Sequence, residues 1–524
     1  MQINEQQIDE IVRGVLQSLQ QDGNGSGNGA TGSTQANGNG GSGIFGGNLN
    51  EAPGAYGGPS ARGGGRIDDP QNRPSNAQSQ GSPSELMGLH GVFGTVDEAV
   101  SAAQTAQRAW MRLPLEKRKQ CVEAMRQAGR DNARRLAEMA VEETGLGRVA
   151  DKEVKNQLCS DRTPGFEMLP LQTFIGDNGL TIEDYFPYGV ICGITPVTNP
   201  TSGTINNLII FAVAGNSTVI CPHPSAKKST MTTMALLNDA VASAGGPRNL
   251  ATGVAEPTLQ TAEAIMKHNV VRLINATGGP AVVKAALGVG KKAVCAGPGN
   301  PPAIVDETAD IDNAARSIVG GASFDNNLLC IGEKATIVVQ EKADALIAAM
   351  KAAGAFLVQG DDARKLAEYV VKDGHINKEP IGWDAARILQ RIGINAPADT
   401  KVALLEVPAD HDLIIEEQLM PVMPLVRARD FAQALEIALK AEGGRGHTLV
   451  IHSRDIMRIT AVRNAYQCTV FVANGPSSAA VGVGGEGFVA MSLAGHTGEG
   501  FTSPATFVKR RRAAFAGALG TSSQ

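Results

Sequence analysis

The chain has 524 residues, of which 42% are hydrophobic and 19% are charged, and its formal net charge is −5. This length allows two or three domains with large cores, and the mild acidity excludes nucleic acid and anionic membranes as expected partners. No apolar run reaches the roughly 18 residues of a membrane span, and the start MQINEQQIDE lacks the basic region of a secretory signal. Seven cysteines without a CxxC pair indicate reduced thiols in a cytoplasmic protein and predict no metal site.

Residues 1–20 predict an amphipathic helix. Its apolar residues are spaced to share one helix face, and they are Ile8, Ile11, Val12, Val15, Leu16 and Leu19. Residues 21–84 predict a disordered linker, because 17 of the 62 glycines lie within residues 21–66. A tethered helix of this length is marginal alone, so we expect its apolar face to bind a partner groove or to fold back onto its own oligomer.

From Glu85 onward the sequence predicts an α/β fold. A capping box, Thr95-Val-Asp-Glu98, opens a helix to about Met111, and further helices are expected over 115–132 and 132–144. The apolar runs YGVICGIT, STVICPH, VVRLINAT, KKAVCAG and PAIVD are typical of strands buried on both faces of a parallel sheet. A second alternating block covers about 309–495, and TSPATFVKRRRAA predicts a basic edge strand.

The stretch SFDNNLLCIGEK places Cys330 after an Asn-rich turn. Two loops precede it in the chain, ITPVTNP at 194–200 and INATGG at 274–279. The second loop opens a helix, where a Gly-Gly turn can approach a phosphate, although such a turn is also common as plain geometry. Taken alone, neither loop decides a function.

In this order, together with the later block Glu416-Glu417-Gln-Leu419-Met-Pro-Val, these segments resemble the aldehyde dehydrogenase superfamily from about residue 91 to 508. The resemblance implies a Rossmann-type cofactor domain (85–172 and 188–297) and an α/β catalytic domain (298–500). It also implies a small β oligomerisation flap (173–187 and 501–515) and hence a homodimer or homotetramer.

The resemblance makes Cys330 the nucleophile that attacks the aldehyde, and backbone N–H groups are expected to lower its pKa. Cys192, Cys221 and Cys295 lie in apolar strands and are expected to be buried and inert. Thr198 and Asn199 stand where the family has its loop asparagine. The cofactor contacts that the resemblance implies are Ile194, Thr195, Pro196, Pro222, His223, Thr277, Gly278, Gly279, Ala296, Gly297, Glu417 and Leu419.

One departure from the family pattern is informative. Ala296 stands where the hydrolytic members carry the glutamate that activates water, so the thioester needs another acceptor, and coenzyme A can serve as one. The sequence is accordingly similar to the CoA-acylating branch. There, Lys227 or Lys228 would lie near CoA phosphates or simply be solvated, and His447 would steer the CoA thiol or be a hydrogen-bonded core histidine.

The helix and linker at the N-terminus resemble those of bacterial microcompartment enzymes, in which the helix binds shell or cargo proteins. The resemblance implies oxidation of propionaldehyde, or of acetaldehyde, by NAD and CoA to the acyl-CoA. Pro222 replaces a lysine of the family, so the preference for NAD or NADP stays open. One rival is a hydrolytic enzyme that uses Glu333 or Glu486 as base. A second rival is an inactive scaffold that recruits partners through residues 1–20.

Overall fold

The computed structural model describes residues 82–372 and 374–517, so the predicted helix at 1–20 and most of the predicted linker lie outside the described residues. The linker was predicted to end at residue 84, but helix α2 (Pro83–Met87) already begins at Pro83. The Ser82 hydroxyl accepts from the Glu85 N–H while the Glu85 carboxylate accepts from the Ser82 N–H, and this capping box starts the helix earlier. Within the described part of the chain, no helix is both long and apolar enough to cross a bilayer.

Four helices follow, and their bounds agree with the prediction to within two residues where one was made. They are α3 (Val96–Arg112), α4 (Leu115–Asp131), α5 (Ala133–Thr144) and α6 (Val149–Arg162). The predicted capping box is confirmed, since the Glu98 N–H donates to Thr95 Oγ1 and the Thr95 N–H donates to Glu98 Oε2. Helix α5 ends at Gly145, whose φ of +67° favours glycine.

The first large sheet is parallel, with strand order β1-β6-β5-β4-β7-β8. Its strands are β1 (Val92–Phe93), β4 (Val190–Thr195), β5 (Ser217–Pro222), β6 (Ala251–Val254), β7 (Val271–Thr277) and β8 (Lys292–Ala296). The connections carry α7 (Ser202–Val213), η3 (Pro224–Ala226), α8 (Lys227–Ser243), α9 (Leu259–Lys267) and α10 (Pro280–Gly288). Successive residues of β4 enter different cores, because Ile191 packs in one cluster and Val190 and Cys192 in another. The sheet is therefore buried on both faces, as its apolar runs predicted.

The second large sheet is also parallel, with order β11-β14-β15-β10-β9-β16-β17. Its strands are β9 (Pro302–Val305), β10 (Ala335–Val339), β11 (Ala355–Val358), β14 (Val402–Glu406), β15 (Val422–Ala428), β16 (Thr448–His452) and β17 (Val470–Ala473). Its helices are α11 (Ile311–Ser323), η4 (Phe324–Asn327), α12 (Gln340–Ala352), α13 (Gly360–Val370), α14 (Ala385–Arg391), α15 (Asp412–Ile415), α16 (Phe431–Glu442), α17 (Ile456–Ala465) and η5 (Ser477–Val481). The predicted α/β class with parallel sheets is confirmed.

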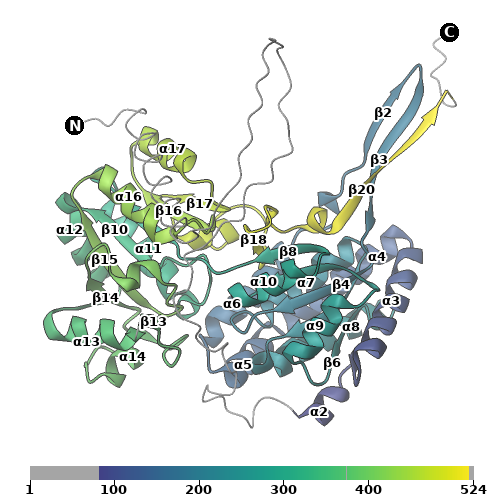
Figure 1. The fold of residues 1–524 in the computed structure, drawn as a ribbon, viewed down its shortest axis with the longest axis horizontal. Helices are drawn as coiled ribbons and strands as arrows, with labels where there is room; N and C mark the ends of the chain where they lie inside the picture. The colour runs from purple at the N-terminus through teal and green to yellow at the C-terminus, as the bar shows by residue number, and fades with distance from the viewer. Residues whose placement is uncertain (1–81, 373, 518–524) are drawn as a thin grey trace, which may run out of the picture. The chain divides into compact units, whose positions relative to one another are not determined.

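A third sheet is antiparallel, and its strands come from two distant parts of the chain. It joins β2 (Gln172–Gly176), β3 (Gly179–Pro187) and β20 (Val508–Ala516), which run side by side in Figure 1. The predicted C-terminal strand is wrong over 501–507. There, β19 (Gly500–Phe501) pairs instead with β18 (Leu493–Ala494), and the short helix η6 (Pro504–Phe507) follows. Ser503 caps η6 and Pro504 occupies its first turn, which ends the extended conformation. The minor elements are η2 (Phe166–Met168), β12 (Val371–Lys372) and β13 (His375–Ile376).

Candidate active site

The predicted cofactor residues of the first sheet lie at the carboxyl ends of four adjacent strands. In chain order they are Ile194, Thr195 and Pro196 at β4, Pro222 and His223 at β5, Thr277, Gly278 and Gly279 at β7, and Ala296 and Gly297 at β8. Cross-strand pairing brings them together, since Thr195 pairs with Pro222 and Thr277 with Ala296. The order of strands reverses its direction at β4, and open α/β sheets bind ligands at such a switch point.

The start of helix α8 carries Lys227 and Lys228. The buried Glu143 carboxylate of α5 accepts hydrogen bonds from the Lys228 and Ser229 N–H groups, each at 2.7 Å. These two backbone donors are therefore already occupied, and the side chains of Lys227 and Lys228 would be the groups that meet a phosphate. His223 caps the preceding 3₁₀ turn, because its Nδ1 accepts from the Ser225 N–H at 3.1 Å.

Two predicted catalytic residues, Cys330 and His447, and the predicted cofactor contact Glu417 lie at the amino ends of strands of the second sheet. Cys330 precedes β10, Glu417 precedes β15 and His447 precedes β16, and the order β15-β10-β9-β16 makes these ends neighbours. Gly299, which precedes β9, lies among them. A Cβ atom on Gly299 would stand 2.5 Å from the Cys330 carbonyl oxygen and 2.8 Å from His447 Nδ1, so only glycine permits this approach.

The turn before Cys330 has an unusual backbone. Asp325, Asn326 and Asn327 all have left-handed φ angles, of 47°, 54° and 61°. Left-handed L-residues cost roughly 1–2 kcal/mol each, less for Asn and Asp, and they persist only where their surroundings hold them. Each side chain is anchored: Asn326 Nδ2 donates to the Gly382 carbonyl and Asn327 Nδ2 to the Glu333 carbonyl, each at 2.9 Å.

Lys334 and Glu417 set the electrostatics around the half-buried Cys330. Burial and the Glu417 carboxylate raise the pKa of the thiol to about 12, while Lys334 and the backbone N–H groups lower it only partly. The expectation of a lowered thiol pKa is therefore wrong for this state, because desolvation outweighs the positive partners. Burial also raises the pKa of Glu417 to about 7, although Lys334 opposes that rise and the Gly299 N–H donates to the carboxylate.

His447 is buried and keeps one ring nitrogen without a partner. Its ring Nδ1 lies 2.8 Å from Thr448 Oγ1, and its backbone N–H donates to Glu442 Oε1 at 2.9 Å. Its ring Nε2 has no hydrogen-bond partner among the described residues. Burial and the nearby His496 and Lys334 lower the pKa of His447 to about 3, so its ring is neutral at pH 7. A neutral ring with a free nitrogen can accept a proton.

Two buried lysines of α6 donate hydrogen bonds to the loop that carries Thr198 and Asn199. Lys152 Nζ donates to the Thr198 carbonyl at 3.1 Å, and Lys155 Nζ donates to Asn199 Oδ1 at 2.6 Å. With Oδ1 occupied, the amide Nδ2 is left to donate, and one of its two N–H groups donates to Thr198 Oγ1 at 3.2 Å. The Asn199 amide is thereby oriented as a hydrogen-bond donor.

Glu333, one of the two bases that the hydrolytic alternative offered, is engaged elsewhere, and the other, Glu486, is exposed. Its buried carboxylate accepts from the Ser477 N–H at 2.7 Å and the Ser477 hydroxyl at 2.9 Å. Its other neighbour is Gly321, where a side chain would collide with it. Glu333 therefore joins η5 to α11 and does not project toward Cys330, and this placement counts against that alternative.

Comparison with known proteins bears on the same site. Residues 93–376 match the aldehyde dehydrogenase family. Over 442 residues the chain is 43% identical to the acetylating acetaldehyde dehydrogenase EutE of Escherichia coli K12, which covers 83% of this chain and 94% of that protein. The chain belongs to the aldehyde dehydrogenase family.

Two solved structures of this family are similar over most of the chain. One is a propionaldehyde dehydrogenase from the fucose utilisation microcompartment of Clostridium phytofermentans, and the other is the Rhodopseudomonas palustris propionaldehyde dehydrogenase with bound CoA and an acylated cysteine. Each is 42% identical with a TM-score of 0.81, over 82% of this chain and 99% of the other.

Sequence reasoning missed several residues of this aldehyde dehydrogenase site. Gly299 could have been found from the sequence, because it belongs to the same turn, residues 296–300, as the predicted cofactor contact Ala296. Glu143, Lys152 and Lys155 carried no signal, since their partners lie 44 to 173 residues away in sequence. Only the packing of α5 against η3 and α8, and of α6 against α7 and η4, brings these side chains to the site.

Proposed function

We propose that this protein is an NAD-dependent, CoA-acylating aldehyde dehydrogenase that converts an aldehyde, CoA and NAD⁺ into an acyl-CoA, NADH and a proton. The single observation that carries the proposal is the environment of Cys330. Gly299, which lies against the Cys330 carbonyl, follows the end of β8, and that strand end carries Ala296 in place of a carboxylate, while the Glu333 carboxylate accepts from Ser477. No base at either position can activate water against a thioester.

The strand ends of the first sheet fit a dinucleotide. A Cβ atom on Gly279, at the start of α10, would meet nothing within 4 Å, and the Gly278 N–H donates to the Ala296 carbonyl, which shapes a tight turn. Gly279 and its neighbours would hold the pyrophosphate, and Glu417 would hold the nicotinamide ribose. NAD, when bound there, accepts the hydride.

Residues of this chain carry out the attack on the aldehyde and the transfer of the acyl group to CoA. Cys330 Sγ bonds to the aldehyde carbon, and the Asn199 amide donates to the oxygen that becomes negative. After oxidation the acyl group is a thioester on Cys330. The CoA sulfur then attacks the thioester carbon while His447 Nε2 accepts a hydrogen bond from the CoA thiol and orients it, and the thiol proton passes to Cys330 Sγ as that sulfur leaves.

The substrate is a short-chain aldehyde, and we assign propionaldehyde, with acetaldehyde as the alternative. This assignment is supported by the names of the similar proteins, which act on either aldehyde. One methylene is worth only about 1–3 kcal/mol of discrimination in an apolar pocket, so both are expected to react.

Two further assignments concern assembly. The third sheet exposes large apolar side chains, with Phe174, Ile175 and Phe515 at 56%, 64% and 46% exposure. A second copy of this chain would bury them, giving a homodimer or homotetramer. Residues 1–20 would bind shell or cargo proteins of a bacterial microcompartment, the setting of one similar structure.

Product analysis tests the function directly. The protein is supplied with propionaldehyde, NAD and CoA, and the product is identified by mass. We expect propionyl-CoA from the natural protein and none from Cys330→Ala. Propionyl-CoA formation by Cys330→Ala would remove the nucleophile from this account, and an enzyme that makes no acyl-CoA at all would refute the function.

A further inference from the structure

A buried charge cluster connects the two loops of the site. Asp325, in the left-handed turn that leads to Cys330, is fully buried and pairs with both Lys152 and Lys155. The same carboxylate accepts from the Arg148 N–H at 2.8 Å, while the Asp325 N–H donates to Asp151 Oδ2 at 2.9 Å. The turn is thus tied to the first residues of α6 from both its backbone and its side chain.

The two lysines extend this connection to the other loop. They lie three residues apart on one face of α6, and side chains at that spacing are neighbours. Lys155 contacts Asp325 and Asn199 Oδ1 with the same ammonium group. A single buried atom, Lys155 Nζ, therefore touches both the turn that leads to Cys330 and the side chain of Asn199.

The space around the cluster leaves little room for adjustment. A side chain on Gly147 would collide with the Asp325 carboxylate. Val197, two residues before Asn199, packs in the same apolar cluster as Leu328, two residues before Cys330. The relative position of the two loops is consequently fixed by an ion pair, a hydrogen bond and apolar packing together.

From these contacts we infer that Lys155 and Asp325 are positioning residues that set the Asn199 amide against Cys330. The inference rests on the proposed function, since it assigns the amide to the oxygen of the reacting aldehyde. Lys155 occupies Asn199 Oδ1, so Nδ2 is left to donate, with one N–H to Thr198 Oγ1 and the other to the aldehyde oxygen. Asp325 pairs with Lys155 and holds its ammonium group beside Asn199. Neither residue touches the substrate.

The test is a double-mutant cycle on the rate of the first NADH burst, measured without CoA. Lys155→Met should slow the burst by about 100-fold, the effect of a misplaced group, and Asn199→Ala by about 100- to 1000-fold. In the Asn199→Ala background, Lys155→Met should slow it by less than about threefold further, because the residue acts through that amide. A full 100-fold loss in that background would overturn the inference.

Two matched measurements separate positioning from general damage. In a His447→Asn background, Lys155→Met should keep its full effect on the burst, because His447 acts after oxidation. Alkylation of Cys330 by iodoacetamide needs no oxyanion donor, so Lys155→Met should change its rate by less than about threefold. An alkylation rate that falls in parallel with the burst would show that Lys155 merely supports the turn.

If Lys155→Met does not fold, Asn199→Asp provides a second test of the inference. The carboxylate retains the contact with Lys155 but has no N–H to donate, so the melting temperature should not fall while the burst slows by about 100-fold or more. A fast burst from Asn199→Asp would overturn the inference. Failure of the natural protein to give any burst would instead refute the proposed function, which separates the two failures.

Discussion

The thiol of Cys330 is governed by two charges of opposite sign within one buried site. Lys334 donates to the carbonyl oxygens of Asn327 and Leu329, at 2.6 and 3.1 Å, and stays in place beside the nucleophile. Burial lowers the pKa of Lys334 to about 8. Glu417, on the other side, raises the pKa of the thiol. The reactive fraction of Cys330 therefore depends on the balance of two neighbours and not on the cysteine alone.

Alkylation of the cofactor-free protein measures this balance. Because the pKa of Cys330 is raised to about 12, thiolate is scarce at neutral pH, and the alkylation rate should rise about tenfold per pH unit from pH 7 to 10. Glu417→Gln removes the charge that raises this pKa and should speed alkylation at pH 8, whereas Lys334→Met should slow it. A rate that levels off by roughly pH 10, with its midpoint at about pH 8.5, would show a thiol of ordinary pKa.

At the scale of single residues, the sequence was a better guide to which side chains the proposed reaction uses than to their electrostatic environment. Cys330, Asn199, Glu417 and His447 were all named from motifs, because each motif is local in sequence. The direction of the thiol pKa was wrong, because it depends on burial and on Glu417, which lies 87 residues further along the chain. Contacts over such separations exist only once the sheets have formed.

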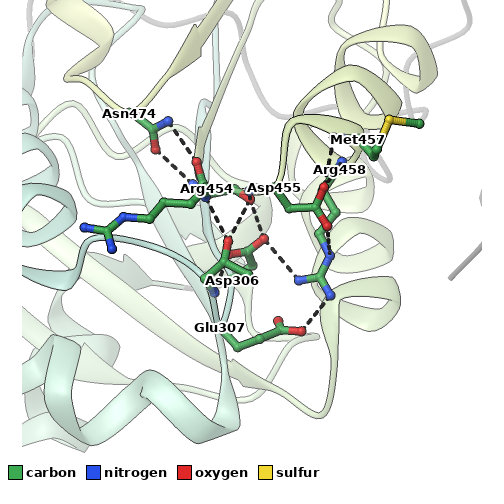
Figure 2. A network of polar contacts seen from close by, with 9 residues as sticks. Asp306, Glu307, Arg454, Asp455, Met457, Arg458 and Asn474 are labelled. Atoms are coloured by element: carbon green, nitrogen blue, oxygen red, sulfur yellow. Dashed lines mark hydrogen bonds and ion pairs between the residues drawn. The ribbon is translucent and has the colours of Figure 1, made fainter. Parts of the chain in front are cut away.

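Among the elements, β9, β16 and α17 are joined by a polar network at the carboxyl edge of the second sheet, away from the amino ends that carry Cys330. Figure 2 shows Asp306 and Glu307 beside Arg458, with Asp455 and Asn474 nearby. The fully buried Asp306 accepts from Ser453 Oγ at 2.6 Å and from Arg458 Nη1 at 3.1 Å, and the Arg458 guanidinium lies 4.8 Å from the Phe431 ring centre. This network stabilises the connection of α17 to the sheet.

Arg458→Met should lower the free energy of unfolding by about 2–4 kcal/mol, because Asp306 stays buried with its charge only partly compensated. Arg454→Met is the matched control. Arg454 pairs with Asp310 at 3.0 Å, but its side chain is 70% exposed, so the loss should be below about 1 kcal/mol. Urea unfolding of both variants provides the measurement, and equal losses would contradict a structural role for the buried pair.

Four strands of the first sheet, β9 of the second sheet and the cap of α3 were predicted, because each is encoded by a local sequence pattern. The end of the third sheet was not. TSPATFVKRRRAA was interpreted as one strand, yet η6 interrupts it and Asn216 Nδ2 donates to the Phe507 carbonyl at 2.8 Å. A contact across nearly 300 residues decides where β20 begins.

At the scale of the whole molecule, the antiparallel sheet of β2, β3 and β20 is the surface where we expect a second copy to bind. Ile175→Glu combined with Phe515→Glu should lower the oligomeric state, because each change places a charge in an apolar interface. Leu259→Glu is the control, since Leu259 is 63% exposed on α9, outside this sheet. Sedimentation velocity distinguishes the species, and an unchanged oligomer would exclude this sheet as the interface.

The N-terminal segment has a separate assignment. Removal of residues 1–20 should leave the turnover rate of the free enzyme unchanged, within about twofold, because surface changes far from a site usually act independently of it. The truncated protein should no longer co-purify with microcompartments from producing cells. Loss of activity in the truncated free enzyme would instead show that this segment belongs to the catalytic fold.

The central claim is that the acyl group on Cys330 waits for CoA, because neither Ala296 nor Glu333 can activate water. The most direct test follows NADH after mixing the enzyme with propionaldehyde and NAD, first without CoA and then with it. The account predicts one NADH per active site without CoA and continuous turnover to propionyl-CoA once CoA is added. Continuous NADH formation without CoA, with propionate as the product, would contradict it.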